Sequence, residues 1–311
     1  MAKKDPVRII ATLPPYVEHR PALIGHPLVD ELRFNSISPA AETRSEMLAR
    51  LKSECGGKKL WIDLKARQLR IAKFAYLPYA FVELNNAIEV DLPAEILFKD
   101  GAARIVEIVD GRKLILDSRP PRVVGEGEPV NILDDSLAIR GKFLLDSDRE
   151  FVEAAKSLGL HDYLLSFVEQ PADIAELLEL DPEAKIIAKI ESRRGLEFVR
   201  RGYGRLRPRV RLMAARDDLY INLGAAKADF LPALELIIRA DPEAAVASRL
   251  LTSLENGPEV SSQDISDLEL MLRLGYRTLM LSDGLCFRED PFNGAIAALG
   301  DILKVRRRRS T

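Results

Sequence analysis

The feature that most constrains the fold of this chain is a regular alternation of short β-rich runs with amphipathic helical stretches. The helical stretches carry apolar residues at three-to-four spacing, and Ser or Asp stands where a helix N-cap is favoured. A strand followed by a helix, repeated eight times, predicts a (β/α)8 TIM barrel of the α/β class. The β-rich runs occupy residues 7–13, 32–36, 59–64, 163–168, 185–191, 210–216, 244–251 and 277–283.

One interval, residues 65–162, breaks this alternation between the third and fourth runs. Residues 72–136 read as β-structure, and Asp110-Gly111 separates two β-rich arms, which is a strong signal for a type I′ hairpin. We therefore predict a small β domain of residues 72–136 inserted into a barrel of residues 1–71 and 137–311. Because barrel active sites lie at the C-terminal ends of the strands, we expect the insertion to stand over the mouth as a lid.

Composition excludes several classes of protein. The chain has 311 residues, of which 47% are hydrophobic, enough to fill a large core that would include Trp61 and Met213. Its formal net charge of -2 gives no bulk attraction for nucleic acid, and two cysteines are too few for a disulfide framework. The N-terminal residues lack the apolar core of a signal peptide, and the sequence lacks an apolar run of about 18 residues. We therefore expect a cytoplasmic protein without membrane or nucleic-acid partners.

Charged and polar residues gather at the ends of the predicted strands. Unpaired charge is expensive in a packed core, so a ring of such residues at one end of a barrel predicts a site for an anion and a metal. The ring contains Arg33, Asn35, Asp63, Lys65, Arg70, Lys189, Glu191, Arg216, Asp217 and Asp218, with Ser248 inside the seventh run.

Lys189 and Glu191 are the most informative pair in this ring. They lie two residues apart in the otherwise apolar run KIIAKIE, so a strand would direct both to the same face. Glu191 and Asp218 offer hard oxygen ligands suited to Mg²⁺ or Mn²⁺, and Lys189 would place a cation beside that metal. A plain ion pair between Lys189 and Glu191 is the alternative, and the other charged strand ends favour the site.

The order and the residues of these segments resemble those of the pyruvate kinase family. The lysine-isoleucine-glutamate motif together with alanine-arginine-x-aspartate is the specific part of the resemblance, which covers the whole barrel. The insertion is shorter than the lid domain of that family, and the sequence ends where members usually continue into a C-terminal regulatory domain. The matching segments are VRIIATLPP, LRFNS, IDLKARQLR, AKIIAKIESRRG, LMAARDDL and SSQDISDLELMLRLGYRTLMLSD.

The resemblance implies a phosphotransferase that moves phosphoryl between phosphoenolpyruvate and ADP. Lys189 would stabilise the phosphoryl group in transfer, and arginines would neutralise phosphate charge. Ser248 replaces a threonine that lies near the enolate carbon. The implied sites are Lys189, Arg33 and Ser248 for catalysis; Arg33, Arg70, Asp217, Asp218 and Ser248 for the phosphorylated substrate; Pro14, Pro15 and Arg70 for the nucleotide; Glu191 and Asp218 for Mg²⁺ or Mn²⁺; and Asn35 and Asp63 for K⁺.

Several positions depart from the family. Asp217 stands in place of a glycine, and we expect its carboxylate to repel the substrate carboxylate and weaken or alter binding. Glu169 replaces an arginine, Gln68 replaces a charged residue associated with the monovalent cation, and Ile37 stands at an expected serine. The glycine-glutamate-threonine after the last strand reads DGLCF here.

These departures leave two alternatives open. The first is a metal-dependent aldolase or lyase that handles another oxo-acid enolate on the same barrel. The second is a non-catalytic homologue that keeps the metal and phosphate contacts. All three hypotheses expect a small phosphorylated or oxo-acid ligand, and a homo-oligomer is compatible with each.

Overall fold

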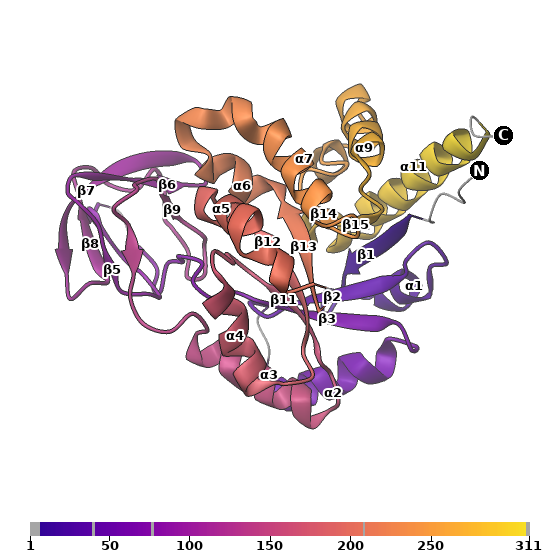
Figure 1. Cartoon of the computed structure of the whole chain (residues 1–311), viewed down its shortest axis with the longest axis horizontal. Coiled ribbons are helices and arrows are strands. Elements are labelled where there is room, and N and C mark those ends of the chain that lie inside the picture. The colour runs from indigo at the N-terminus through magenta and orange to yellow at the C-terminus, as the bar shows by residue number, and fades with distance from the viewer. Residues whose placement is uncertain (1–6, 39–40, 76–77, 208, 309–311) are drawn as a thin grey trace.

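The barrel predicted from the alternation is present in the computed structural model, which describes residues 7–38, 41–75, 78–207 and 209–308. In this part of the chain, eight parallel strands close into a barrel, and each predicted β-rich run contributes one of them (Figure 1). The α/β fold class is therefore confirmed. Around the barrel the strands are β1 (Arg8–Thr12), β15 (Thr278–Met280), β14 (Ala245–Ala247), β13 (Val210–Ala215), β12 (Lys185–Ile190), β11 (Asp162–Leu165), β3 (Lys59–Leu64) and β2 (Glu31–Asn35).

Helices surround the barrel and begin at the signals that the sequence predicts. Ser261 caps α9 by accepting the N–H of Asp264, and Gly275, with a φ of 116°, ends that helix. The described residues include no helix long and apolar enough to cross a membrane. The helices are α1 (Arg20–Gly25), α2 (Arg44–Glu54), α3 (Asp146–Ser157), α4 (Pro171–Leu180), α5 (Arg193–Arg201), α6 (Arg216–Asn222), α7 (Phe230–Ala240), α8 (Ser253–Asn256), α9 (Ser262–Leu274), α10 (Asp283–Cys286) and α11 (Glu289–Arg308), with 3₁₀ turns at Tyr203–Arg205 and Gly224–Asp229.

Side chains fill the barrel interior in layers, because every second residue of a strand points inward. Trp61 and Met213 belong to the interior cluster and are almost fully buried, which confirms their prediction as core residues. Ile187 of β12 lies in the same cluster. Lys189 lies two residues after Ile187 in β12, and Asp63 lies two residues after Trp61 in β3. Both side chains therefore face the barrel interior, one layer nearer the C-terminal mouth.

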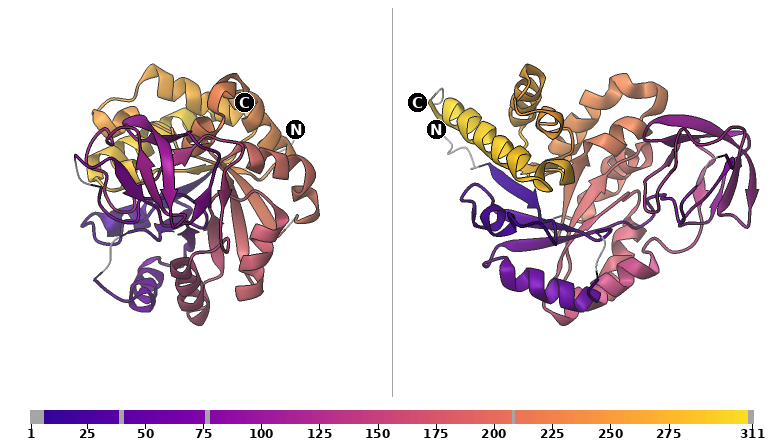
Figure 2. Two further views of the ribbon diagram at one scale, coloured as in Figure 1. Left: turned by 90° about the vertical axis from the view of Figure 1, so that its left-hand side faces the viewer. Right: turned by 180° about the vertical axis from the view of Figure 1, so that it is seen from behind.

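The segment between β3 and α3 forms antiparallel structure with a buried apolar cluster of its own. Figure 2 shows it at one end of the barrel, and because β3 leads into it, this is the C-terminal end of the strands. Asp110 and Gly111 have φ values of 51° and 69° between paired strands, which confirms the predicted hairpin. The described strands are β4 (Phe81–Glu83), β8 (Lys113–Leu116), β7 (Gly101–Val109), β6 (Ala94–Phe98) and β9 (Asn131–Ile132) in sheet order, plus the pair β10 (Ala138–Ile139) and β5 (Ile88–Glu89).

Side-chain hydrogen bonds join the insertion to the barrel. Asn222 of α6 donates a hydrogen bond of 3.0 Å to the amide oxygen of Asn131 in β9. Arg70, just after β3, donates to the backbone carbonyl of Gly127. Asn131 and Asn222 also line a cleft of about 850 Å³, which is bordered by insertion strands and by the loops that follow β11 and β12. The insertion therefore borders the mouth of the barrel.

Asp148 fixes the turn through which the chain leaves β3. Its buried carboxylate accepts the N–H groups of Lys65 at 3.0 Å, Ala66 at 2.9 Å and Leu145 at 3.1 Å. Ala66 has a φ of 46°, a conformation that a residue other than glycine adopts at a cost. The carboxylate thus offsets backbone strain directly beside the mouth.

We expect Asp148→Ala to lower the free energy of unfolding by about 2–4 kcal/mol, because it strands two buried N–H donors and one half-buried donor. Urea denaturation measures this change. Asp146→Ala is the matched control, since Asp146 is an exposed carboxylate in the same first turn of α3 and should cost less than about 1 kcal/mol. Equal losses in the two variants would contradict the role of Asp148.

Candidate active site at the barrel mouth

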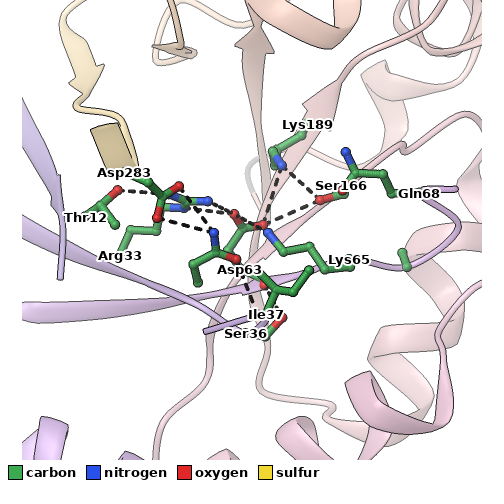
Figure 3. Close-up of polar contacts among 12 residues, drawn as sticks. Thr12, Arg33, Ser36, Ile37, Asp63, Lys65, Gln68, Ser166, Lys189 and Asp283 are labelled. Carbon is green, nitrogen blue, oxygen red and sulfur yellow. Dashed lines mark hydrogen bonds and ion pairs between the residues drawn. The ribbon is translucent and has the colours of Figure 1, made fainter. Parts of the chain in front are cut away.

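Asp63 is the centre of a buried charge network at the mouth, drawn in Figure 3. It is fully buried, and its Oδ2 accepts from Arg33 Nε at 2.8 Å and from Lys65 Nζ at 3.0 Å. Lys189 Nζ lies 3.5 Å from the other oxygen, Oδ1. Arg33 of β2 and Lys189 of β12 therefore point a cation at this carboxylate of β3, and Lys65 adds a third cation from the residue after β3, as the clustering of charged strand ends predicts.

The network shifts the pKa values of its members in opposite directions. Burial alone would raise the pKa of Asp63, but Lys189, Lys65 and Arg33 hold it well below its usual range. Burial, aided by the cations Lys189 and Arg33, lowers the pKa of Lys65 to about 7 against the attraction of Asp63. Burial also disfavours charged Lys189, yet Asp63 and Glu191 raise its pKa. Lys189 is thus a stable buried cation.

Lys189 is held from several sides. Its Nζ donates to Ser166 Oγ at 2.9 Å and lies 3.1 Å from Glu191 Oε1. The other oxygen of Glu191 accepts the N–H of Phe167 at 2.6 Å, and Phe167 has a left-handed φ of 51°. The ion pair of Lys189 with Glu191 therefore exists, but it is one part of a larger arrangement that includes Ser166, a residue that the sequence interpretation missed.

Glu191 and Asp218 are the two carboxylates predicted to hold a divalent metal. Burial, together with the nearby charge of Glu191, raises the pKa of the half-buried Asp218, which also accepts a weak hydrogen bond of 3.4 Å from Gln68. A carboxylate whose charge is disfavoured by burial and by a neighbouring carboxylate fits a site where a cation would stabilise it. Among the described residues no three His, Cys, Asp or Glu side chains are grouped to hold a metal, so Mg²⁺ or Mn²⁺ would also need water and substrate oxygens.

Arg70 differs from the other cations because, within the described residues, no carboxylate lies within ion-pair distance of it. Its guanidinium donates to the backbone carbonyl of Gly127 and to Gln68 Oε1, while its buried Nε has no partner there. Burial lowers the pKa of Arg70. A desolvated guanidinium with an unused donor is suited to an anion.

Arg33, by contrast, is bound on all sides. Its Nη1 donates to Thr12 Oγ1 at 2.9 Å and lies 2.8 Å from Asp283 Oδ2, in addition to its bond to Asp63. Asn35 Nδ2 donates to both oxygens of Asp283 at 3.3 Å. Sequence reasoning missed Asp283, although the DGLCF departure was the signal that marked its position.

The structure gives the predicted K⁺ ligands other roles. Asp63 serves as the counter-ion of protein cations, and Asn35 directs its amide nitrogen to Asp283 and its oxygen to the N–H of Ile37 at 3.4 Å. Ser36 donates to the backbone carbonyl of Asp63 at 2.7 Å. The K⁺ site stays a prediction, with its expected ligands engaged by protein groups.

Four predicted residues lie apart from the network. The backbone carbonyl of Ser248, which has a φ of 63°, accepts from Arg216, and exposed Asp217 pairs with Arg249 at 2.8 Å. Pro14 and Pro15 are buried. In the described part of the chain, no hydrogen bond or ion pair joins these residues to Asp63. The positions that the network does unite are Arg33, Asn35, Asp63, Lys65, Lys189 and Glu191.

We expect Asp63→Asn to lower the free energy of unfolding by about 3–5 kcal/mol, because buried cations lose their shared counter-ion. Chemical denaturation followed by circular dichroism measures the loss. The control is Asp301→Asn, which removes an exposed carboxylate paired with Lys304 and should change stability by less than about 1 kcal/mol. A stability of Asp63→Asn equal to that of the control would refute the network.

Comparison with known proteins assigns no family to this chain. No protein-family model matches it, and a search of curated proteins finds no match. Its function must be inferred from the residues at the barrel mouth.

Proposed function

We propose that this chain is a pyruvate-kinase-like phosphotransferase that moves phosphoryl between phosphoenolpyruvate and ADP. The observation that carries the proposal is Lys189, a buried cation fixed by Ser166, Glu191 and Asp63 at the C-terminal end of a closed barrel. Phosphoryl transfer needs little covalent help and much positive charge at fixed positions. A rigid ammonium in a desolvated mouth supplies that charge.

Each remaining group has a part in this proposal. Arg70, whose Nε is unused, would receive phosphate oxygens, and Lys189 would face the group in transfer. Glu191 and Asp218 would hold Mg²⁺ or Mn²⁺, which when bound neutralises charge on phosphate oxygens. The insertion, which borders the mouth through its contact with Arg70, would exclude water as a lid.

The chemical step would consume phosphoenolpyruvate, ADP and one proton, which solvent supplies. The bond between phosphorus and the enol oxygen breaks while a bond forms to a terminal oxygen of ADP. The enolate that remains takes a proton to give pyruvate. Lys189 favours this exchange because negative charge on the phosphoryl oxygens persists throughout the transfer beside its ammonium.

A second candidate is a metal-dependent aldolase or lyase acting on an oxo-acid enolate. The engagement of Arg33 by Asp283 favours it, since that contact reduces the positive charge available to a phosphate. Such an enzyme would need the carboxylate pair but no nucleotide. Turnover that depends on ADP separates the first candidate from the second.

The test is pyruvate release from phosphoenolpyruvate and ADP with Mg²⁺, with and without K⁺. Lys189→Met keeps the length and apolar packing of the side chain, and we expect it to reduce kcat by roughly a hundredfold or more with a smaller effect on KM. Lys304→Met, at an exposed lysine, is the control and should leave kcat unchanged. A Lys189→Met variant that melts earlier but turns over normally would assign the lysine a structural role instead.

We expect Glu191→Gln and Asp218→Asn each to weaken Mn²⁺ binding, because each removes one anionic ligand of a site with few others. Titration calorimetry measures the affinity, and circular dichroism checks that the fold is kept. Asp301→Asn removes the same charge far from any predicted ligand and should bind as the unaltered protein does. Unchanged affinity in both site variants would remove the metal site.

A further inference from the structure

The contact between Asp283 and Arg33 places a carboxylate where an incoming anion would bind. Asp283 Oδ2 lies 2.8 Å from Arg33 Nη1, and the Asn35 amide donates to both oxygens of Asp283 at 3.3 Å. The Arg33 side chain is 7% exposed, whereas the Asp283 side chain is 35% exposed. Solvent therefore reaches the carboxylate of Asp283 more than it reaches the guanidinium that the carboxylate binds.

Local packing holds Asp283 in this position. The preceding Ser282 caps α10 by accepting the N–H of Leu285 at 3.3 Å, and its hydroxyl donates to Glu255 Oε1 of α8 at 2.7 Å. A Cβ added to Gly284 would lie 2.4 Å from the carboxyl carbon of Glu255, so the two helices meet closely there. The first residue of α10 is thus fixed facing Arg33.

The two arginines of the mouth, Arg33 and Arg70, therefore differ in their binding partners. Arg70 has an unused Nε and no carboxylate within ion-pair distance among the described residues, whereas Arg33 is shared by Asp63 and Asp283. A carboxylate and a phosphate bind guanidinium through the same charge-assisted hydrogen bonds. An anion that reaches Arg33 must compete with Asp283, but one that reaches Arg70 meets no such competitor.

We propose that Asp283 is an internal competitor for anions at Arg33 and that it limits the phosphate affinity of the mouth. It lowers the affinity for an anion at Arg33, because the guanidinium donors that the anion needs are shared with this carboxylate. The inference rests on the proposed function in one respect, that phosphate binds at this mouth. It does not require that phosphoryl transfer occurs.

The experiment is calorimetric titration of the full chain with inorganic phosphate at constant ionic strength. Asp283→Asn keeps the shape of the side chain but removes its charge, and we expect it to raise phosphate affinity roughly tenfold or more. The double variant Arg33→Gln with Asp283→Asn is the matched control, and the gain should vanish in it because the released guanidinium is absent. Asp283→Ser is a second, smaller neutral variant that should reproduce the gain if Asp283→Asn folds poorly.

Each outcome of this titration decides the question. A gain in the single variants that is lost in the double variant supports competition at Arg33. Unchanged affinity in the single variants, a gain that persists without Arg33, or undetectable binding in all variants would overturn it. Because phosphate binding is measured without turnover, a protein that fails to release pyruvate but shows the gain would refute the proposed reaction and retain the role of Asp283.

Discussion

The barrel mouth depends on one buried carboxylate. Asp63 lies where Arg33, Lys65 and Lys189 converge, and without its charge those cations would repel one another in a poorly solvated interior. A buried charge is tolerated when it is paired and hydrogen-bonded, and Asp63 meets both conditions. The pairing has a cost in flexibility, because each cation is fixed by the same two oxygens. For a site that needs charge at set positions, this rigidity is useful.

The barrel itself was predictable because its signals are local. The apolar run around Lys189 predicts a strand, and the two-residue spacing of Lys189 and Glu191 predicts that both side chains point into the barrel. Asp110-Gly111 predicts a hairpin from two adjacent residues. Such signals need no knowledge of distant parts of the chain.

The partners of the charged residues were not predictable in the same way. Asp283 and Arg33 are 250 residues apart, and Ser166 follows β11 whereas Lys189 lies in β12, so their contacts arise only when the barrel closes. Residue type alone could not show whether Asp63 would bind a metal cation or pair with cationic side chains of the protein. Pro14 and Pro15 show the same limit, since a proline reads alike in sequence whether it is exposed or buried. The folded chain decides which ionisable groups neutralise each other.

The hydrogen bond from Arg70 to the carbonyl of Gly127 joins the charge at the mouth to the position of the insertion. If an anion binds Arg70 more tightly in one placement of the insertion than in another, thermodynamic linkage requires the insertion to favour that placement by the same free energy. The reciprocal also holds: a substitution in the strands of the insertion that shifts its resting position would change anion affinity without touching a ligand. Selection for ligand preference in such a chain can therefore act on residues far from the barrel.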